Sequence, residues 1–246
     1  MSHETLERGP RVRRHRPWWR GGSSVQRWNG EVLSWALIGL GAGMLLGAFV
    51  GGLLGTVALW IALLVPVILA ARRGIPRGIL LFRPVDLLYG IVLGTVLRLT
   101  QGWLAVALGG SGALPSYASL DGRLPNLWWL SDGIGGILVA PVIEEFFFRG
   151  VLLIAILTLV RRLAGHTGAA IGVGGAVAVV ASTALFVMAH LLTGQMTMDA
   201  VGGLILLGLI AGCLVAFTGR IWPAVLVHVV YNGLGVGLTV VGTLLG

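Results

Sequence analysis

The chain has 246 residues, of which 57% are hydrophobic and only 11% are charged, with a mean hydropathy of +0.95. A soluble domain carries roughly 25% charged residues to keep its surface hydrated, so this composition excludes a soluble globular protein. The net charge is +8 and every basic residue is an arginine, which in so apolar a chain favours contact with anionic membrane lipid over nucleic acid. The composition therefore predicts an all-α, polytopic membrane protein without a nucleic-acid partner.

The N-terminal segment carries much of the positive charge. Seven of the 17 arginines lie between Arg8 and Arg27, among prolines and glycines, so residues 1–31 are expected to form a disordered cytoplasmic tail with an interfacial Trp28. The first apolar stretch lacks an obvious cleavage site, and we expect a retained helix rather than a signal peptide. Cys213 is the only cysteine, which rules out an intrachain disulfide and a cysteine metal site.

Long apolar stretches predict a bundle of about seven transmembrane helices, within a range of about six to eight. No ionisable side chain occurs between Val32 and Ala71, and this stretch is long enough for two helices, which we expect to be separated by a turn near Gly51–Gly55. A segment rich in glycine and proline at 109–132 is expected to lie along the interface. The remaining helices are predicted at about 86–108, 133–160, 168 to beyond 190, 201–218 and 222–246.

Threading these helices through the membrane separates the arginines by side. On one side of the membrane, Arg123 is the only arginine, and acidic residues accompany it. The other side receives the N-terminal tail and seven further arginines: Arg72, Arg73, Arg77, Arg83, Arg161, Arg162 and Arg220. The positive-inside rule then places the N-terminus in the cytoplasm and the C-terminus outside. Arginine without lysine, with abundant glycine and alanine, is typical of a GC-rich bacterial genome, so we expect a bacterial cell membrane.

Several polar side chains fall inside the predicted helices, where each ionisable group costs about 2.5–3.5 kcal/mol or more. Glu145 and Arg149 are four residues apart and can pair on one helix face, whereas Glu144 points about 100° away from them. A buried salt-bridge network that also includes Arg98 would account for part of the set without any chemistry. The full set is Arg98, Glu144, Glu145, Arg149, His190 and His228, with Asn232 as an uncharged companion.

Three of these residues are predicted to lie at a similar depth. At a rise of about 1.5 Å per residue in a core of about 30 Å, Glu144, His190 and His228 lie roughly 13 to 18 Å below the outer edge. They come from three separate helices, and Asn232 follows His228 by one helical turn on the same face. A carboxylate without a pairing partner, level with two histidines, favours a single polar site suited to chemistry.

The same residues carry a family resemblance. The segment EEFFFRG at 144–150 resembles the EExxxR signature of the CPBP family, the CAAX-processing and bacteriocin-processing intramembrane proteases. FVMAH at 186–190 resembles its FxxxH motif, and HVVYN at 228–232 resembles its HxxxN motif. Three motifs in order on separate helices are specific. The resemblance divides the membrane part into N-terminal helices with an interfacial loop at 32–132 and a CPBP-like catalytic core at 133–246.

The resemblance implies an intramembrane endopeptidase that cuts a membrane-associated or hydrophobic peptide. Glu144 would be the general base that activates water together with His190, and His228 and Asn232 would stabilise the oxyanion. Burial of a carboxylate raises its pKa toward the range useful for acid–base work. A buried donor aimed at an oxyanion is worth about 3–4 kcal/mol. The ion pair on the same helix would then support the general base, and no cofactor is expected.

Three alternatives stay open. Glu144, His190 and His228 are also a ligand set for catalytic zinc, although the sequence lacks HExxH and a ligand role for Glu144 would remove the evident base. A non-catalytic relative that acts as a membrane scaffold or peptide-immunity protein is the alternative from another class, and the complete polar set argues against it. A transporter with a proton relay is a weaker third, because no inverted repeat of broken helices is visible.

Overall fold

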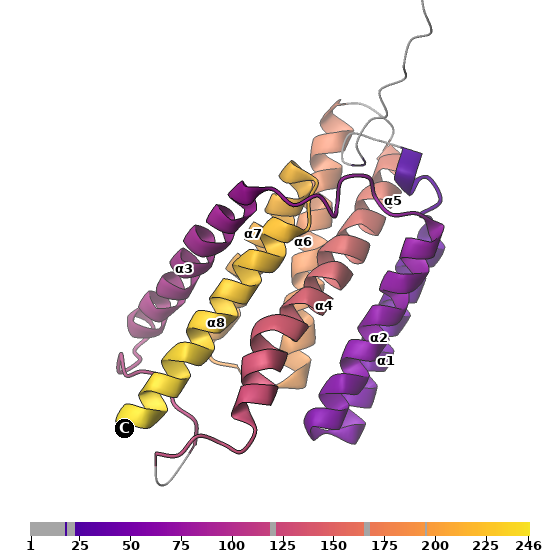
Figure 1. Ribbon diagram of the computed structural model, residues 1–246. Helices are drawn as coiled ribbons and strands as arrows, with labels where there is room; N and C mark the ends of the chain where they lie inside the picture. Colours follow the sequence, from indigo (N-terminus) through magenta and orange to yellow (C-terminus); the bar gives the residue numbers. More distant parts are fainter. Residues whose placement is uncertain (1–17, 19–22, 119–121, 165–167, 195) are drawn as a thin grey trace, which may run out of the picture.

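The computed structural model of the chain describes residues 18, 23–118, 122–164, 168–194 and 196–246, and within these parts all regular structure is helical. The helices form one bundle with roughly parallel axes (Figure 1). Six of them are long and apolar enough to cross a membrane. Together with the helical run between 129 and 164 they make the predicted multi-pass helical bundle, which is thereby confirmed.

The first two helices form a hairpin. α1 (Gly30–Val50) and α2 (Gly52–Arg73) are joined by Gly51, whose φ of 67° lies in the left-handed region that glycine tolerates. The predicted turn therefore falls at the expected glycines. A side chain at Gly55 would collide with the carbonyl of Gly47, so the two backbones approach each other more closely than any larger residue would allow.

After α3 (Pro84–Ala107) and the long connection that follows it, one helical run extends from Trp129 to Ala164 with two changes of winding. It consists of a π-helical segment η3 (Trp129–Val139), an α-helical segment α4 (Ala140–Phe147), a second π segment η4 (Phe148–Leu153) and α5 (Ile154–Ala164). The run begins four residues before the predicted start. Wide π turns inside helices occur frequently at functional sites, and here they flank the two turns of α4.

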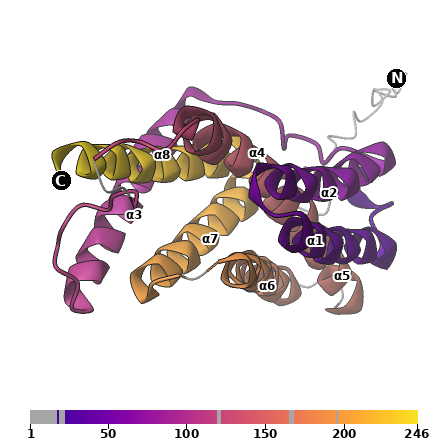
Figure 2. The same ribbon diagram turned by 90° about the horizontal axis from the view of Figure 1, so that it is seen from below.

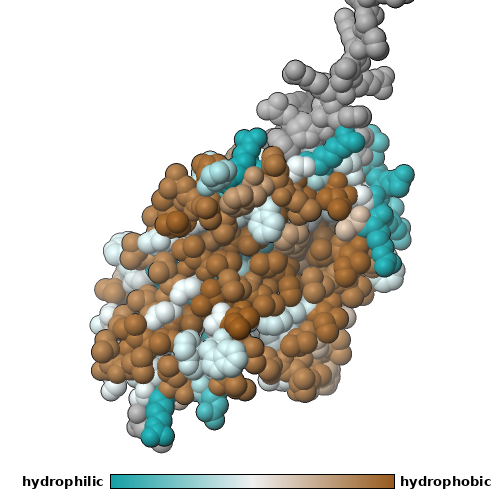
Figure 3. All heavy atoms as spheres, viewed as in Figure 1, coloured by the Kyte–Doolittle hydropathy of each residue, from teal (hydrophilic) through white to brown (hydrophobic). Residues whose placement is uncertain are grey.

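Three further helices complete the bundle: α6 (Gly168–Thr193), α7 (Met198–Thr218) and α8 (Trp222–Leu245). Seen along the bundle, α7 lies between α6 and α8, α3 packs on α8, and the α1–α2 hairpin covers the opposite side of α4 (Figure 2). The helical run from 129 to 164 therefore contacts both the hairpin and the C-terminal helices. Many apolar side chains of the helices are exposed, and they cover most of the face of the bundle that Figure 3 shows, as a lipid-facing surface requires.

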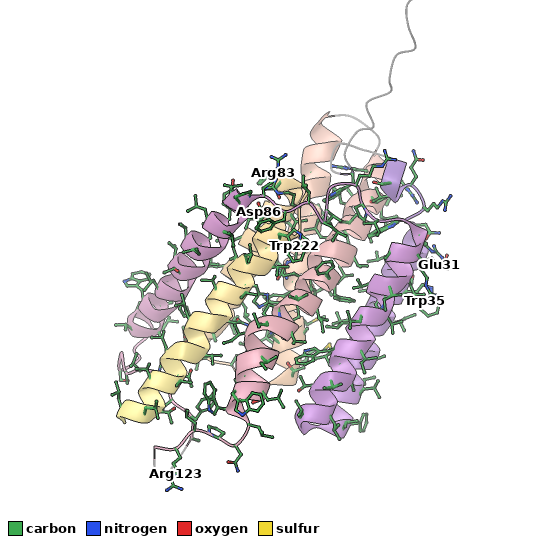
Figure 4. The ribbon with its side chains drawn as sticks, viewed as in Figure 1. Glu31, Trp35, Arg83, Asp86, Arg123 and Trp222 are labelled. Atoms are coloured by element: carbon green, nitrogen blue, oxygen red, sulfur yellow. The ribbon has the colours of Figure 1, made fainter. Side chains whose placement is uncertain are left out.

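The two ends of the bundle differ in charge. At the end where α1, α3 and α8 begin, the structure places Arg27, Arg72, Arg73, Arg77, Arg83, Arg161, Arg162 and Arg220. We call this the arginine-rich end. The opposite end, where α3 finishes, carries Arg123 (Figure 4), and we call it the arginine-poor end. The separation of the arginines that was predicted from the sequence is present in the fold.

The end of the N-terminal tail contains helical structure where the structure describes it. Ser23–Val25 forms a helical turn and α1 begins at Gly30, within the predicted tail of residues 1–31. Trp28 is buried and donates from Nε1 to the carbonyl of Gly74 at 3.0 Å. The segment is ordered because it packs against the connection after α2. The prediction for residues 1–17 and 19–22 lies outside the described residues.

Candidate active site

The two adjacent glutamates of α4 have different surroundings. The side chain of Glu144 is 16% exposed and lines a cavity, whereas that of Glu145 is fully buried. Adjacent residues of an α-helix point about 100° apart, so α4 presents one carboxylate to the cavity and the other to the packed interior, as predicted from the spacing. Pro141, the second residue of α4, lies within the continuous helical run and has no N–H to donate to a carbonyl of the preceding turn.

Glu144 lies next to two histidines from distant parts of the chain. Its Oε2 atom is 4.0 Å from Nε2 of His190 on α6 and 3.9 Å from Nε2 of His228 on α8. The structure thus brings together the three residues that were predicted to share one depth. Both distances exceed hydrogen-bonding range, and polar groups at this separation are commonly bridged by one water.

Glu145 binds two partners through one carboxylate oxygen. Its Oε1 atom is 2.9 Å from Nδ1 of His228 and 3.0 Å from Nη1 of Arg149. Arg149 also donates from Nη2 to the carbonyl of Gly208 on α7 at 3.3 Å, and its side chain is fully buried. The predicted ion pair of Glu145 with Arg149 is therefore formed, and it has a third member, His228, that the sequence did not reveal.

Phe186 packs at the centre of these groups. Its ring centroid lies 4.6 Å from that of His190 and 5.8 Å from that of His228, and the Arg149 guanidinium carbon lies 4.5 Å from it. The Phe186 carbonyl is 2.9 Å from Nδ1 of His190. A carbonyl only accepts, so Nδ1 carries a hydrogen and the Nε2 atom of neutral His190 faces Glu144 with its lone pair. The first residue of the FxxxH motif thus orients the last.

Asn232 lies one turn beyond His228 on α8 but takes part in a different contact. Its Nδ2 atom donates to the carbonyl of Gly136 in η3 at 2.9 Å. The side chain lines a second cavity of about 770 Å³ rather than the one that contains Glu144, and Gly136 lines both. The structure therefore places Asn232 one turn from His228, in contact with a residue of η3 that lines both cavities.

The cavity beside Glu144 has a volume of about 560 Å³. One wall is the α1–α2 hairpin, which contributes apolar side chains such as Met44, Leu59 and Trp60, and the other walls are η3, α4 and the end of α6. A space of this size accommodates several residues of a peptide with apolar side chains. The N-terminal helices, for which the sequence suggested no role, thus form one side of the site.

Arg98 does not join the Glu145–Arg149 pair, and its predicted place in a common salt-bridge network is wrong. Its guanidinium donates to the carbonyl of Tyr231 at 2.8 and 3.1 Å and to Oε1 of Gln101 at 2.7 Å. Gln101 in turn donates to Asp199 at 3.1 Å. α3 packs against α8 at this height, so Arg98 reaches the backbone one residue before Asn232 and ties α3 to the helix that carries His228.

The arrangement of the acidic and histidine side chains also bears on metal binding. Among the described residues, no group of three or more His, Cys, Asp or Glu side chains has an arrangement that could hold a metal. The Nε2 atoms of His190 and His228 lie 4.0 and 3.9 Å from Oε2 of Glu144, and the other ring nitrogen of His228 contacts Glu145.

Fold and site together define a polytopic membrane protein that holds an acid–base cluster inside its helical bundle. Residues 126–234 match the family model described as type II CAAX prenyl endopeptidase Rce1-like. This match agrees with the resemblance drawn from the three motifs and supports a membrane-embedded peptidase. The comparisons with curated proteins and with solved structures gave no match.

Proposed function

We propose that the protein is an intramembrane endopeptidase that hydrolyses a peptide bond of a membrane-associated or hydrophobic substrate. The observation that carries the proposal is the position of Glu144, a carboxylate at a cavity wall with the Nε2 atoms of His190 and His228 at 4.0 and 3.9 Å. The family match over 126–234 includes all three residues. Carboxylate and imidazole side chains are the usual groups for proton transfer at an attacking water.

Glu144 acts as the general base in this proposal. A water between Glu144 and His190 donates one hydrogen to the carboxylate and the other to Nε2 of His190, which the contact of Nδ1 with Phe186 leaves free to accept. The water oxygen attacks the scissile carbonyl carbon and its proton passes to Glu144. The same proton then moves to the amine nitrogen as the C–N bond breaks, which returns Glu144 to its starting state.

His228 and Asn232 stabilise the tetrahedral oxyanion. Nδ1 of His228 is engaged by Glu145, so its Nε2 donates to an oxyanion only when the ring carries both protons. The Nδ2 atom of Asn232 has a second hydrogen besides the one that binds Gly136.

The reaction is proposed to proceed without a metal. A ligand role would occupy the Glu144 carboxylate that the mechanism uses as its base, and the three side chains do not have the arrangement of a ligand set. Elemental analysis of purified, active protein tests this proposal. We expect activity in samples with far less than one zinc per chain, and stoichiometric zinc whose removal abolishes activity would contradict it.

The proteolytic function is tested by comparing peptide termini in host membranes that contain either the wild type or Glu144→Gln. We expect new termini with the wild type that are absent with Glu144→Gln. Glu31→Gln is the matched control, because it makes the same change at a half-exposed residue of α1 and should leave the termini unchanged. Identical termini with folded wild type and folded Glu144→Gln would favour the scaffold or immunity role instead.

A further inference from the structure

We infer that the active-site cavity opens at the arginine-poor end of the bundle, on the extracytoplasmic side of the membrane. Its substrates are then membrane-anchored proteins or peptides whose cleaved segment lies on that side. The inferred substrate class rests on the proposed proteolytic function. The position of the cavity opening follows from the structure and the charge distribution, and it can be tested in a protein without proteolytic activity.

The position of the cavity mouth follows from where its lining residues lie in their helices. Gly52 is the first residue of α2, Ser131 is the third residue of η3 and Thr193 is the last residue of α6. All three of these helix ends lie at the arginine-poor end, because α2 and the helical run from 129 start there and α6 finishes there. The cavity therefore extends from Glu144 to this end of the bundle.

Toward the arginine-rich end the interior below Glu144 is tightly packed. Phe147, Phe148, Leu152 and Leu153 follow Glu144 along the same helical run, and each is at most 1% exposed. Phe148 stacks edge-on against Phe186 at a centroid distance of 5.2 Å. A peptide arriving from the arginine-rich end would have to displace these side chains, and cores of this density do not open without a large loss of stability.

A second layer covers the arginine-rich end itself. Trp18 is fully buried and donates from Nε1 to the carbonyl of Gly219 at 3.1 Å, where α7 meets α8. Trp28 is 2% exposed, and Ile221, at the start of α8, is fully buried. These residues pack at the end of the bundle that carries most of the arginines, and the cavity that Trp28 and Ile221 line there, of about 110 Å³, is much smaller than the one beside Glu144.

The charge distribution assigns the two ends to the two sides of the membrane. Arginine and lysine accumulate in the cytoplasmic segments of membrane proteins, and the described arginines outside the helix interiors all lie at one end except Arg123. The arginine-rich end is therefore cytoplasmic and the cavity mouth is extracytoplasmic. A peptide at the C-terminus of a cytosolic protein would then meet the closed end, whereas an exported or membrane-anchored chain meets the open one.

Cysteine accessibility tests the opening directly. In a Cys213→Ala background, single cysteines are introduced as Ala113→Cys in the loop of the arginine-poor end, Arg77→Cys at the arginine-rich end and Thr193→Cys at the cavity mouth. All three positions are exposed, and the contact of Arg77 with Ser24 uses its backbone N–H, so the substitution preserves it. Bacterial spheroplasts that contain each variant are treated with a membrane-impermeant maleimide. One sample is labelled intact and a second sample is labelled after permeabilisation.

We expect Ala113→Cys and Thr193→Cys to be labelled in intact spheroplasts to a similar extent, and Arg77→Cys only after permeabilisation. The reverse pattern would overturn the assignment of sides. Labelling of Ala113→Cys without labelling of Thr193→Cys, even after permeabilisation, would overturn the opening of the cavity at this end. None of these results depends on proteolysis.

The position of the cleaved bonds tests the substrate class separately. New termini that depend on Glu144 are expected in segments on the extracytoplasmic side, within or close to a membrane anchor. Termini in cytoplasmic segments would overturn the inferred substrate class while supporting proteolysis. If no termini depend on Glu144, the proposed function fails, and the maleimide labelling still decides the orientation.

Discussion

Glu145 and His228 are joined by a hydrogen bond of 2.9 Å between residues 83 positions apart in the chain. The bond connects α4 to α8 in the interior, beside the cavity that Glu144 lines. One glutamate of the pair at 144 and 145 thus faces the proposed reaction, while the other holds an imidazole and a guanidinium in place. The two residues have the same side chain, and their neighbours determine what each one does.

This difference predicts that the same substitution lowers the stability of the protein at position 145 and abolishes its proteolytic activity at position 144. Glu145→Gln leaves Arg149 fully buried without a charged partner, and breaking a buried pair in this way costs about 3–5 kcal/mol. Glu144→Gln removes a partly exposed carboxylate and is expected to leave stability near that of the wild type while abolishing proteolysis. Thermal unfolding in detergent, with turnover measured on the folded fraction, distinguishes them. Equal melting temperatures for the two variants would contradict the assignment.

The charges of Glu145 and Arg149 are also predicted to be energetically coupled. Arg149→Ala should lower the folded yield strongly, because it leaves the Glu145 carboxylate buried with one unsatisfied oxygen already present. The double variant Glu145→Gln with Arg149→Ala should lose less stability than the two single losses combined. A double-mutant cycle on unfolding free energies measures this coupling. Full yield of Arg149→Ala with no activity would instead place Arg149 among the residues that act on the substrate.

A second buried ion pair is expected to matter for stability alone. Asp86 is fully buried, accepts from Arg220 at 2.5 and 3.2 Å and also accepts from the backbone N–H of Arg83. Asp86→Asn should therefore cost about 3–5 kcal/mol without changing turnover per folded molecule, because the pair lies at the arginine-rich end. The half-exposed pair of Glu31 and Arg73 is the control, and Glu31→Gln should cost at most about 1 kcal/mol. Similar losses for both variants would refute the distinction.

Alkaline pH should reduce the contribution that the loop after α3 makes to the stability of the fold. Burial, and then the hydrogen bond of its hydroxyl to Asp132 at 3.0 Å, raises the pKa of Tyr117 from its ordinary 10.0 to about 12. The protonated phenol is thus favoured in the fold. Its contribution to stability is present below pH 10.0 and is lost as the pH rises toward about 12.

The change that tests this pH dependence is Tyr117→Phe, which removes the hydroxyl. Melting temperatures of the wild type and the variant should converge as the pH rises from 10.0 to about 12. The measurement is the difference in melting temperature between the two proteins at each pH. A constant difference across that window would show that the phenol does not contribute through its ionisation.

The sequence predicted those features of the site that depend on distance along one helix. The four-residue spacing of Glu145 and Arg149 predicts a shared face, and the depth of Glu144, His190 and His228 follows from the rise per residue. The bond from Glu145 to His228 also depends on how α4 and α8 are rotated about their own axes. No spacing within one helix contains that information, so the contact emerges only from the packed bundle.

The same reasoning explains the errors. The sequence predicts a place for Arg98 in a salt-bridge network with the other intramembrane charges, but its guanidinium binds a backbone carbonyl and Gln101 instead. Carbonyl groups are present at every residue, so no sequence motif marks such a partner. The contacts of Trp28 with Gly74 and of Asn29 with Arg73 likewise join residues that are distant in the chain, and local composition does not reveal them.

The π segments before and after α4 have a consequence for how this site can evolve. A π turn holds one residue more than the corresponding α turn, so η3 sets the rotational phase at which α4 begins. Removing a single residue between Trp129 and Val139 would turn Glu144 about 100° relative to everything before it. Within this segment the number of residues is therefore under tighter constraint than their identity. A deletion there would move the carboxylate off the cavity even if every motif residue were retained.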